Sequence, residues 1–209
     1  MLIGILGKKG SGKDTCADYL IKKYNFKKIS FATPLKTALI SIFNMKHNQL
    51  YGEEKEIKDK YWDIEPRKLM QYFGTDLMRD KYDKNIWLKS ISKWLENNKD
   101  SNIVIPDCRF QNEVDFILEK NGIVIKIDRY DEIKDNHISE NEINEIKNFT
   151  YCIQNNNTLD KLYSNLDKYI EIKNNNKKEK QLIDKINDIL NENNIDKINT
   201  LKYFVDTIN

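Results

Sequence analysis

Short apolar runs alternate with stretches of helical spacing along most of the chain. Leu2–Leu6 is a continuous apolar run, and Ile103–Pro106 and Ile123–Asp128 are two more. Runs of this length without polar alternation are typical of parallel strands buried on both faces. Shorter strands are predicted at 27–31 and 151–153. The pattern therefore predicts an α/β fold in which five parallel strands are joined by right-handed crossovers.

The connections between these strands have helical spacing. Apolar residues recur on one face from Thr15 to Tyr24, directly after the first strand. Further helices are predicted at 34–45, 110–120 and 159–170. The segment of about 47–98 is mostly helical, with Pro66 at a helix start and Gly74 as a break. Since it carries no strong strand, it is predicted to be a helical insert.

The remaining polar stretches suggest how the domain is divided. Residues 1–172 contain all five predicted strands, and the polar stretch of about 129–148 is interpreted as a lid-like loop. Residues 174–180, "NNNKKEK", are interpreted as a linker to a helical C-terminal extension at 173–209. That extension either packs on the main domain or serves as a docking or dimerisation element, so a homodimer stays an alternative.

Composition narrows the class of protein. The formal net charge of +2 is too small to predict stable binding to nucleic acid, and no apolar run is long enough to cross a membrane. The start of the chain lacks the pattern of a signal peptide. Cys16, Cys108 and Cys152 are widely spaced, which favours reduced thiols. A cytoplasmic enzyme, without a membrane partner, is the expectation.

A phosphate-binding loop follows the first predicted strand. Gly7–Lys13 reads G-x-x-x-x-G-K, and a helix is predicted directly after it. Glycines let consecutive backbone N–H groups turn toward an anion at the positive end of the helix. Lys13 adds a charge that can reach the β- and γ-phosphates. A nucleoside triphosphate, ATP, is the predicted ligand.

The loop departs from the common motif after its lysine. Asp14 stands where Ser or Thr usually contacts Mg²⁺, and the hydroxyl comes one residue later, at Thr15. A carboxylate is also a hard oxygen ligand for Mg²⁺, and its charge is favourable at a helix N-terminus. Asp14 is therefore expected to bind Mg²⁺ directly or through water, and Thr15 to contact the α-phosphate.

Several further motifs accompany this loop. They are "GKKGSGKDT" (7–15), "FATPLK" (31–36), "PRKLMQYFGTDLMRDKYDKNIW" (66–87), "IPDCRFQNE" (105–113), "HISE" (137–140) and "IQNNNTLDKL" (153–162). Together, and in this order, they resemble the phage-type deoxynucleoside monophosphate kinases. The resemblance covers about residues 1–172 and implies the three-layer α/β/α fold of P-loop nucleoside monophosphate kinases.

The resemblance implies an activity and its participants. The family transfers the γ-phosphoryl group of ATP to a deoxynucleoside monophosphate and gives the diphosphate, with Mg²⁺ as cofactor. Such transfer depends on positioning and charge neutralisation, and guanidinium groups suit phosphate because they bind it through two parallel hydrogen bonds. If the chain is viral, the host cytoplasm is the expected compartment.

The loop motif and the resemblance together define the candidate site residues. Catalytic roles are expected for Lys13, Arg79, Asp107 and Arg109. The residues expected to bind ATP are Lys9, Gly10, Ser11, Gly12, Lys13, Asp14, Thr15 and Asn155. The residues expected to bind the acceptor are Lys8, Lys36, Trp62, Arg67, Gln71, Gly74, Thr75, Arg109, Asn112, Glu113 and Arg129. Asp107, at the carboxyl edge of the predicted sheet, is a second candidate for Mg²⁺, directly or through water.

Some of these residues have a structural alternative. Trp62 or Trp87 could stack on the base, but aromatic residues at helical spacing are also typical of a core. Asn112 and Glu113 could cap a helix instead of contacting substrate. Residues 155–158 could contact adenine or cap the last helix. His137 is interpreted as a solvated loop residue, because an acceptor that is already a phosphate dianion needs no strong base.

Three other functions are compatible with a phosphate-binding loop. One is a small-molecule kinase of another type, acting on phosphomevalonate or dephospho-coenzyme A, for which a panel of acceptors would be decisive. Another is a P-loop ATPase acting on nucleic acid, which the lack of a basic face disfavours. The third is an inactive nucleotide-binding module, with Asp14 as the damaged position.

Overall fold

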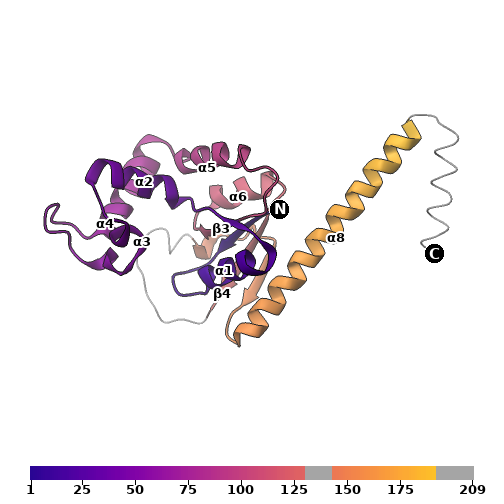
Figure 1. The fold of residues 1–209 in the computed structure, drawn as a ribbon, viewed down its shortest axis with the longest axis horizontal. Helices are drawn as coiled ribbons and strands as arrows, with labels where there is room; N and C mark the ends of the chain where they lie inside the picture. The colour runs from indigo at the N-terminus through magenta and orange to yellow at the C-terminus, as the bar shows by residue number, and fades with distance from the viewer. Residues whose placement is uncertain (130–142, 192–209) are drawn as a thin grey trace. The chain divides into compact units, whose positions relative to one another are not determined.

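A five-stranded parallel sheet forms the centre of the fold. The computed structural model describes residues 1–129 and 143–191. The strands are β1 (Leu2–Leu6), β2 (Lys27–Lys28), β3 (Ile103–Cys108), β4 (Ile123–Asp128) and β5 (Tyr151–Gln154). Their order in the sheet is β2-β3-β1-β4-β5, and all neighbouring pairs are parallel (Figure 1). The predicted α/β fold with a parallel sheet is confirmed.

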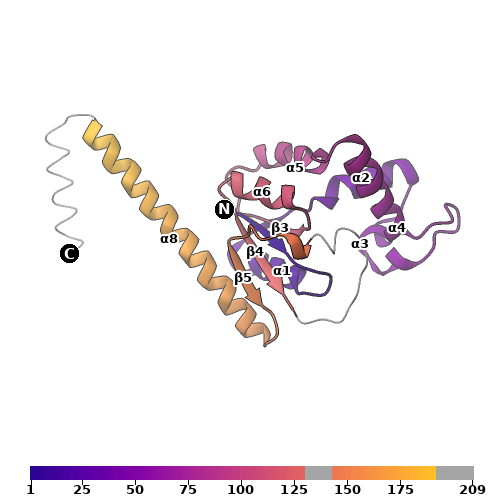
Figure 2. The same ribbon diagram turned by 180° about the vertical axis from the view of Figure 1, so that it is seen from behind.

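Helices cover both faces of this sheet (Figures 1 and 2). The connections are α1 (Lys13–Tyr24), α2 (Ala32–Phe43), α5 (Ile86–Glu96) and α6 (Gln111–Glu119). Side chains of α5 and α6 share a core with β1, β3 and β4, in which Leu88, Ile91, Val114 and Ile117 are buried. The first helix, α1, packs on the other face, against β1 and β3.

The segment between α2 and α5 consists of helices and the loops that join them. It contains α3 (His47–Tyr51), the 3₁₀ helix η1 (Glu53–Glu56), α4 (Pro66–Gln71) and the π-helix η2 (Tyr72–Tyr82). A second, smaller core of Leu35, Leu39, Met45, Leu50 and Leu69 joins these helices to α2. Trp87 packs against both cores, so it links the insert to the sheet domain.

The break predicted at Gly74 is wrong. Helical structure runs without interruption from Pro66 to Tyr82, and its winding widens from α to π after Gln71. Gly74 is buried, and a Cβ atom built there would lie only 2.6 Å from Cδ2 of Leu35. The glycine therefore permits close packing of η2 on α2, and it does not end the helix.

The strand predicted at 27–31 is shorter than expected. Only Lys27 and Lys28 form β2, which pairs with Ile103 and Val104 of β3. After one further hydrogen bond, from the N–H of Ile29 to the carbonyl of Val104 at 3.1 Å, the chain turns toward α2. Residues that would have extended the strand are instead held by side-chain hydrogen bonds at the start of that helix.

The linker predicted at 174–180 is also wrong. These residues lie inside α8 (Leu159–Asn191), which continues through them without a break. Lysine and glutamate are good helix formers and the stretch has neither glycine nor proline, so a polar sequence alone does not end the helix. The chain divides into two compact units, Met1–Leu162 and Tyr163–Asn209, and the described part of the second unit is helical.

Some predictions fall outside the described residues. They include His137, the "HISE" motif at 137–140, most of the proposed lid-like loop and the end of the C-terminal extension. Among the described residues, no helix has both the length and the apolar character needed to span a membrane.

Candidate active site

The loop between β1 and α1 has the geometry of an anion cradle. Gly10 and Gly12 adopt left-handed backbone angles, with φ of 82° and 103°. A side chain in that conformation is strained. A Cβ atom at Gly12 would also lie 2.6 Å from Nδ2 of Asn155. Gly12 is the N-cap of α1 and has no side chain to accept from the first helical N–H groups, which leaves them available to an anion.

Two polar side chains are buried in this loop. Lys13 is 8% exposed, and its ammonium group donates a hydrogen bond to the carbonyl of Lys8 across the loop. Ser11 is 3% exposed, and its Oγ is one of the two buried side-chain atoms without a hydrogen-bond partner among the described residues. A buried hydroxyl without a partner is costly. A bound phosphate would supply the acceptor that Ser11 lacks.

A pocket of about 580 Å³ adjoins the loop. Its lining includes Gly10, Gly12 and Thr15 on one side and Arg129, Asn155 and neighbouring residues on the other. Asn155 is fixed from two directions, because its Nδ2 donates to the carbonyl of Ser11 at 2.9 Å and its backbone N–H donates to the carbonyl of Asp128 at 2.7 Å. Asn155 thus joins the end of β5 to the phosphate-binding loop.

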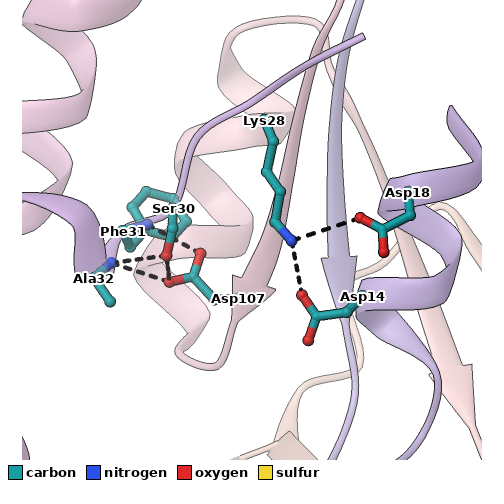
Figure 3. A network of polar contacts seen from close by, with 7 residues as sticks. All are labelled: Asp14, Asp18, Lys28, Ser30, Phe31, Ala32 and Asp107. Atoms are coloured by element: carbon teal, nitrogen blue, oxygen red, sulfur yellow. Dashed lines mark hydrogen bonds and ion pairs between the residues drawn. The ribbon is translucent and has the colours of Figure 1, made fainter. Parts of the chain in front are cut away.

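Asp14 projects from the first turn of α1 and pairs with a residue that was not among the sequence candidates. The Nζ of Lys28 lies 2.9 Å from Oδ1 of Asp14 and 3.9 Å from Oδ1 of Asp18 (Figure 3). The side chain of Asp14 is 79% exposed. Lys28 lies inside the strand predicted at 27–31, and it comes to the carboxyl edge of the sheet, beside the loop, because the observed β2 ends there.

Asp107 is the second-last residue of β3, near the carboxyl edge of the sheet, and both of its carboxylate oxygens accept hydrogen bonds. Its Oδ1 accepts from the backbone N–H of Phe31, and its Oδ2 from that of Ala32, each at 3.0 Å. The hydroxyl of Ser30 also donates to Oδ2 (Figure 3). The carboxylate thereby caps α2 and joins its N-terminus to β3.

The turn after β3 depends on a buried carboxyl group. Oε2 of Glu113 accepts the backbone N–H of Arg109 at 2.7 Å and that of Phe110 at 3.1 Å. Burial raises the pKa of Glu113 to about 8, with the charge of Asp107 acting in the same direction. Glu113 therefore caps α6 from within and fixes the backbone that carries Arg109.

The start of α6 also contacts the end of the insert. The guanidinium of Arg79, on η2, lies over the ring of Phe110, with its central carbon 3.4 Å from the ring centroid. Asn112 donates to the carbonyl of Lys84 at 3.0 Å and to Oδ1 of Asn85 at 2.9 Å. These contacts bring Arg79 to the turn of Arg109, although the two residues are distant in sequence.

Two other cations on this side of the site have internal partners. Arg67, on α4, donates through Nε to Oε1 of Glu56, which is also 3.9 Å from the Nζ of Lys9 in the phosphate-binding loop. The ammonium of Lys36, on α2, lies 4.0 Å from the ring centroid of Tyr51. Burial and the charge of Lys55 lower the pKa of Lys36, and the charges of Asp107 and Asp14 oppose that shift.

The aromatic candidates have structural contacts. Nε1 of Trp62 donates to the carbonyl of Phe43 at 2.8 Å, and the two rings meet edge to face with centroids 5.1 Å apart. Nε1 of Trp87 donates to the carbonyl of Gly74 at 3.0 Å. Trp62 is still 42% exposed, whereas Trp87 belongs to the cores. Gln71 and Thr75 are half-buried on the same helical segment as Gly74.

The parallel sheet and the loop between β1 and α1 together define a P-loop nucleotide-binding fold. Dephospho-CoA kinase from Campylobacter jejuni has a similar fold, with a TM-score of 0.52 and 17% identity over 84% of this chain and 98% of that structure. That identity shows the fold alone.

Sequence comparison defines the family within that class. The family model for deoxynucleotide monophosphate kinase matches residues 1–65 and 46–166. A putative deoxynucleotide monophosphate kinase of Acanthamoeba polyphaga mimivirus is 43% identical, over 79% of this chain and 94% of the relative. The deoxynucleotide monophosphate kinase of Enterobacteria phage T4 is 25% identical, over 82% and 99%. The chain belongs to the deoxynucleotide monophosphate kinase family.

Proposed function

We propose that this protein transfers the γ-phosphoryl group of ATP to a deoxynucleoside monophosphate, giving ADP and the deoxynucleoside diphosphate. The family supports the reaction class. The observation that carries the proposal is the loop of Gly10, Gly12 and Lys13, whose left-handed glycines and buried lysine suit a polyphosphate.

The donor is held mainly by the backbone in this scheme. The N–H groups at the start of α1 and the ammonium of Lys13 bind the β- and γ-phosphates, while Ser11 and Thr15 supply hydroxyl groups. Lys9 lies at the edge of the loop. The adjoining pocket, with Asn155, would receive the nucleoside part of ATP. Arg129, which the sequence indicated for the acceptor, also lines this pocket and would contact ATP in this scheme. As the phosphoryl group moves, these donors stabilise the charge that builds on its oxygens.

Asp14 would hold Mg²⁺ in this scheme. Its exposed carboxylate lies in the first turn of α1, beside the phosphate cradle, and carboxylate oxygen is a ligand that Mg²⁺ accepts. The ion would neutralise charge on the donor phosphates. Asp107 fits this role less well than the sequence indicated, because both of its oxygens already accept hydrogen bonds at the start of α2. Asp107 then acts by positioning α2.

The acceptor is held by side chains in this scheme. Arg79 lies over Phe110, the residue next to Arg109, and these two arginines would bridge the transferring group. Lys8, Lys36 and Arg67 would bind the monophosphate, and the exposed face of Trp62 would contact the base. The insert that carries Arg67 also carries Gln71, Gly74 and Thr75. Asn112, on α6, contacts the end of this insert. Guanidinium groups are suited to this task, since they can contact two phosphate oxygens at once.

The test is an assay of the purified chain with ATP, MgCl₂ and each deoxynucleoside and ribonucleoside monophosphate, with products separated by chromatography. Formation of the matching deoxynucleoside diphosphate is expected. Dephospho-coenzyme A and phosphomevalonate serve as acceptors for the alternative kinase types. Turnover of either of these, without turnover of any deoxynucleoside monophosphate, would contradict the proposal.

A further inference from the structure

Lys28 lies beside Asp14 in the site, although none of the sequence motifs contains it. It is the last residue of β2, and its ammonium lies between two carboxylates of α1, 2.9 Å from Asp14 and 3.9 Å from Asp18 (Figure 3). Asp14 and Asp18 are one helical turn apart, so they present their carboxylates on the same face of α1. The single ammonium can therefore pair with either acid.

The neighbouring charged groups have other partners, whereas the ammonium of Lys28 pairs with α1. The oxygens of Asp107 accept from Ser30, Phe31 and Ala32, so that carboxylate is directed toward α2. Lys36 lies within electrostatic range of Asp14, Asp107 and Lys28, but its ammonium is placed on the ring of Tyr51. Among the residues that the structure describes, Lys28 is thus the cation in hydrogen-bond contact with Asp14.

We propose that Lys28 is a positioning residue that sets how readily Asp14 is released to bind Mg²⁺. The proposal rests on the proposed function, in which Asp14 is the metal ligand. A Ser or Thr at this position is neutral and needs no counter-ion, whereas the carboxylate of Asp14 attracts one. Lys28 pairs with the carboxylate of Asp14 until nucleotide and metal arrive. Asp18 then gives the ammonium of Lys28 a second partner when that ammonium leaves Asp14.

Removal of Lys28 and removal of its second partner, Asp18, should therefore have opposite effects on the Mg²⁺ concentration that the protein requires. In Lys28→Met, Asp14 has lost its competing ammonium, so less Mg²⁺ should be needed. In Asp18→Asn, the ammonium has lost its alternative partner and remains on Asp14, so more Mg²⁺ should be needed. The three side chains are partly exposed, and exposed ion pairs are weak. Shifts of about two- to fivefold in the required Mg²⁺ concentration are expected.

The experiment measures metal binding without turnover. The full chain, saturated with ADP, is titrated with MgCl₂, and the thermal unfolding midpoint gives the concentration that produces half of the stabilisation. The variants are Lys28→Met, Lys28→Gln, Asp18→Asn and Lys28→Met in an Asp14→Asn background. Lys27→Met, next to Lys28 on β2, is the matched control, because its ammonium pairs instead with Asn98 at 3.3 Å.

Each outcome supports or overturns the proposal. Support requires a lower midpoint concentration in both Lys28 variants, a higher one in Asp18→Asn, no shift in Lys27→Met, and no effect of Lys28→Met once Asp14 is Asn. An unchanged or raised concentration in the Lys28 variants, an equal effect in the Asp14→Asn background, or no Mg²⁺-dependent stabilisation of the unsubstituted chain overturns it. Failure of the proposed function would instead appear as absent phosphoryl transfer in the acceptor panel.

Discussion

The two sides of the site are built in different ways. On the donor side, the loop of Gly10, Gly12 and Lys13 offers backbone N–H groups whose positions follow from the strand and helix that flank them. On the proposed acceptor side, the candidate groups are long side chains from the insert and from the turn that precedes α6. Arg67 pairs with Glu56, and Arg79 lies over Phe110.

This difference bears on how each side meets its ligand. Backbone groups fixed by secondary structure need little rearrangement, so the donor side is preformed. Two of the proposed acceptor cations, Arg67 and Arg79, have internal partners that the monophosphate would have to replace or join, which would make that side adjustable. Substitutions on the donor side should therefore affect the chemical step most, and those on the acceptor side should affect binding and pH dependence.

The largest effect is expected for Lys13→Ala. In the proposed mechanism its buried ammonium contributes charge at the donor phosphates, and loss of a donor to the transition state commonly costs about 10²-fold or more in turnover. The rate constant for phosphoryl transfer at saturating ATP and monophosphate is the measurement. Lys22→Ala, in the last turn of the same helix, is the control. Near-normal turnover of Lys13→Ala would remove the lysine from the mechanism.

A smaller effect on the rate is expected for Arg109→Lys. The planar guanidinium would be replaced by a point charge that cannot make two parallel hydrogen bonds, and about a tenfold loss in kcat/KM for the monophosphate is expected. The KM for ATP should change less. Steady-state kinetics with each substrate varied in turn separates the two effects. If the kinetics are unchanged, Arg109 lies outside the acceptor site.

The acceptor side should also carry a pH-dependent contribution to stability. Because burial raises the pKa of Glu113 to about 8, the folded chain keeps a proton that the unfolded chain releases near 4.5. The free energy of unfolding attributable to this group should therefore fall as pH rises from about 5 to about 8, by on the order of 2–4 kcal/mol.

Glu113→Gln should remove this pH dependence while keeping an oxygen that can accept the N–H groups of Arg109 and Phe110. Urea denaturation at several pH values, comparing the variant with the unsubstituted chain, measures the difference. Glu119→Gln, at the end of α6, is the control. Parallel pH profiles for Glu113→Gln and the unsubstituted chain would show that Glu113 titrates at an ordinary pKa.

The smallest effect is expected for Glu56→Gln. This substitution weakens the ion pair that holds Arg67 and faces Lys9, and exposed pairs contribute about 0.2–1 kcal/mol. The KM for the monophosphate should fall by about two- to threefold with little change in kcat. Glu53→Gln, in the same short helix, is the matched control. An increase in KM would mean that Glu56 positions Arg67 for the substrate and does not compete with it.

Local sequence was sufficient for most of the sheet and for the donor side. Apolar runs at 2–6, 103–106 and 123–128 correspond to β1, β3 and β4, and the glycine motif lies in the loop between β1 and α1. The family resemblance was confirmed by the family model and by the viral relatives. Such features are predictable because strand burial, loop glycines and helix starts each depend on residues that are adjacent in the chain.

Helix continuity was predicted less well. Gly74 and the polar run at 174–180 both predict interruptions, but both lie within helices. In the first case, contact between Gly74 and Leu35 of α2 explains the small residue. In the second, the helical preference of the lysines and glutamate outweighs the absence of an apolar face. A glycine or a polar run in the sequence was therefore not sufficient to distinguish a continuous helix from one that ends.

The sequence by itself therefore determined the sheet, the phosphate-binding loop and the family. The tertiary structure decided how the charged side chains are paired: Lys28 with Asp14, Arg67 with Glu56, and Asp107 with the start of α2. The reason is physical. A loop of backbone N–H groups is specified by a few consecutive residues, whereas the partner of a long charged side chain depends on which distant elements the fold brings within a few ångströms.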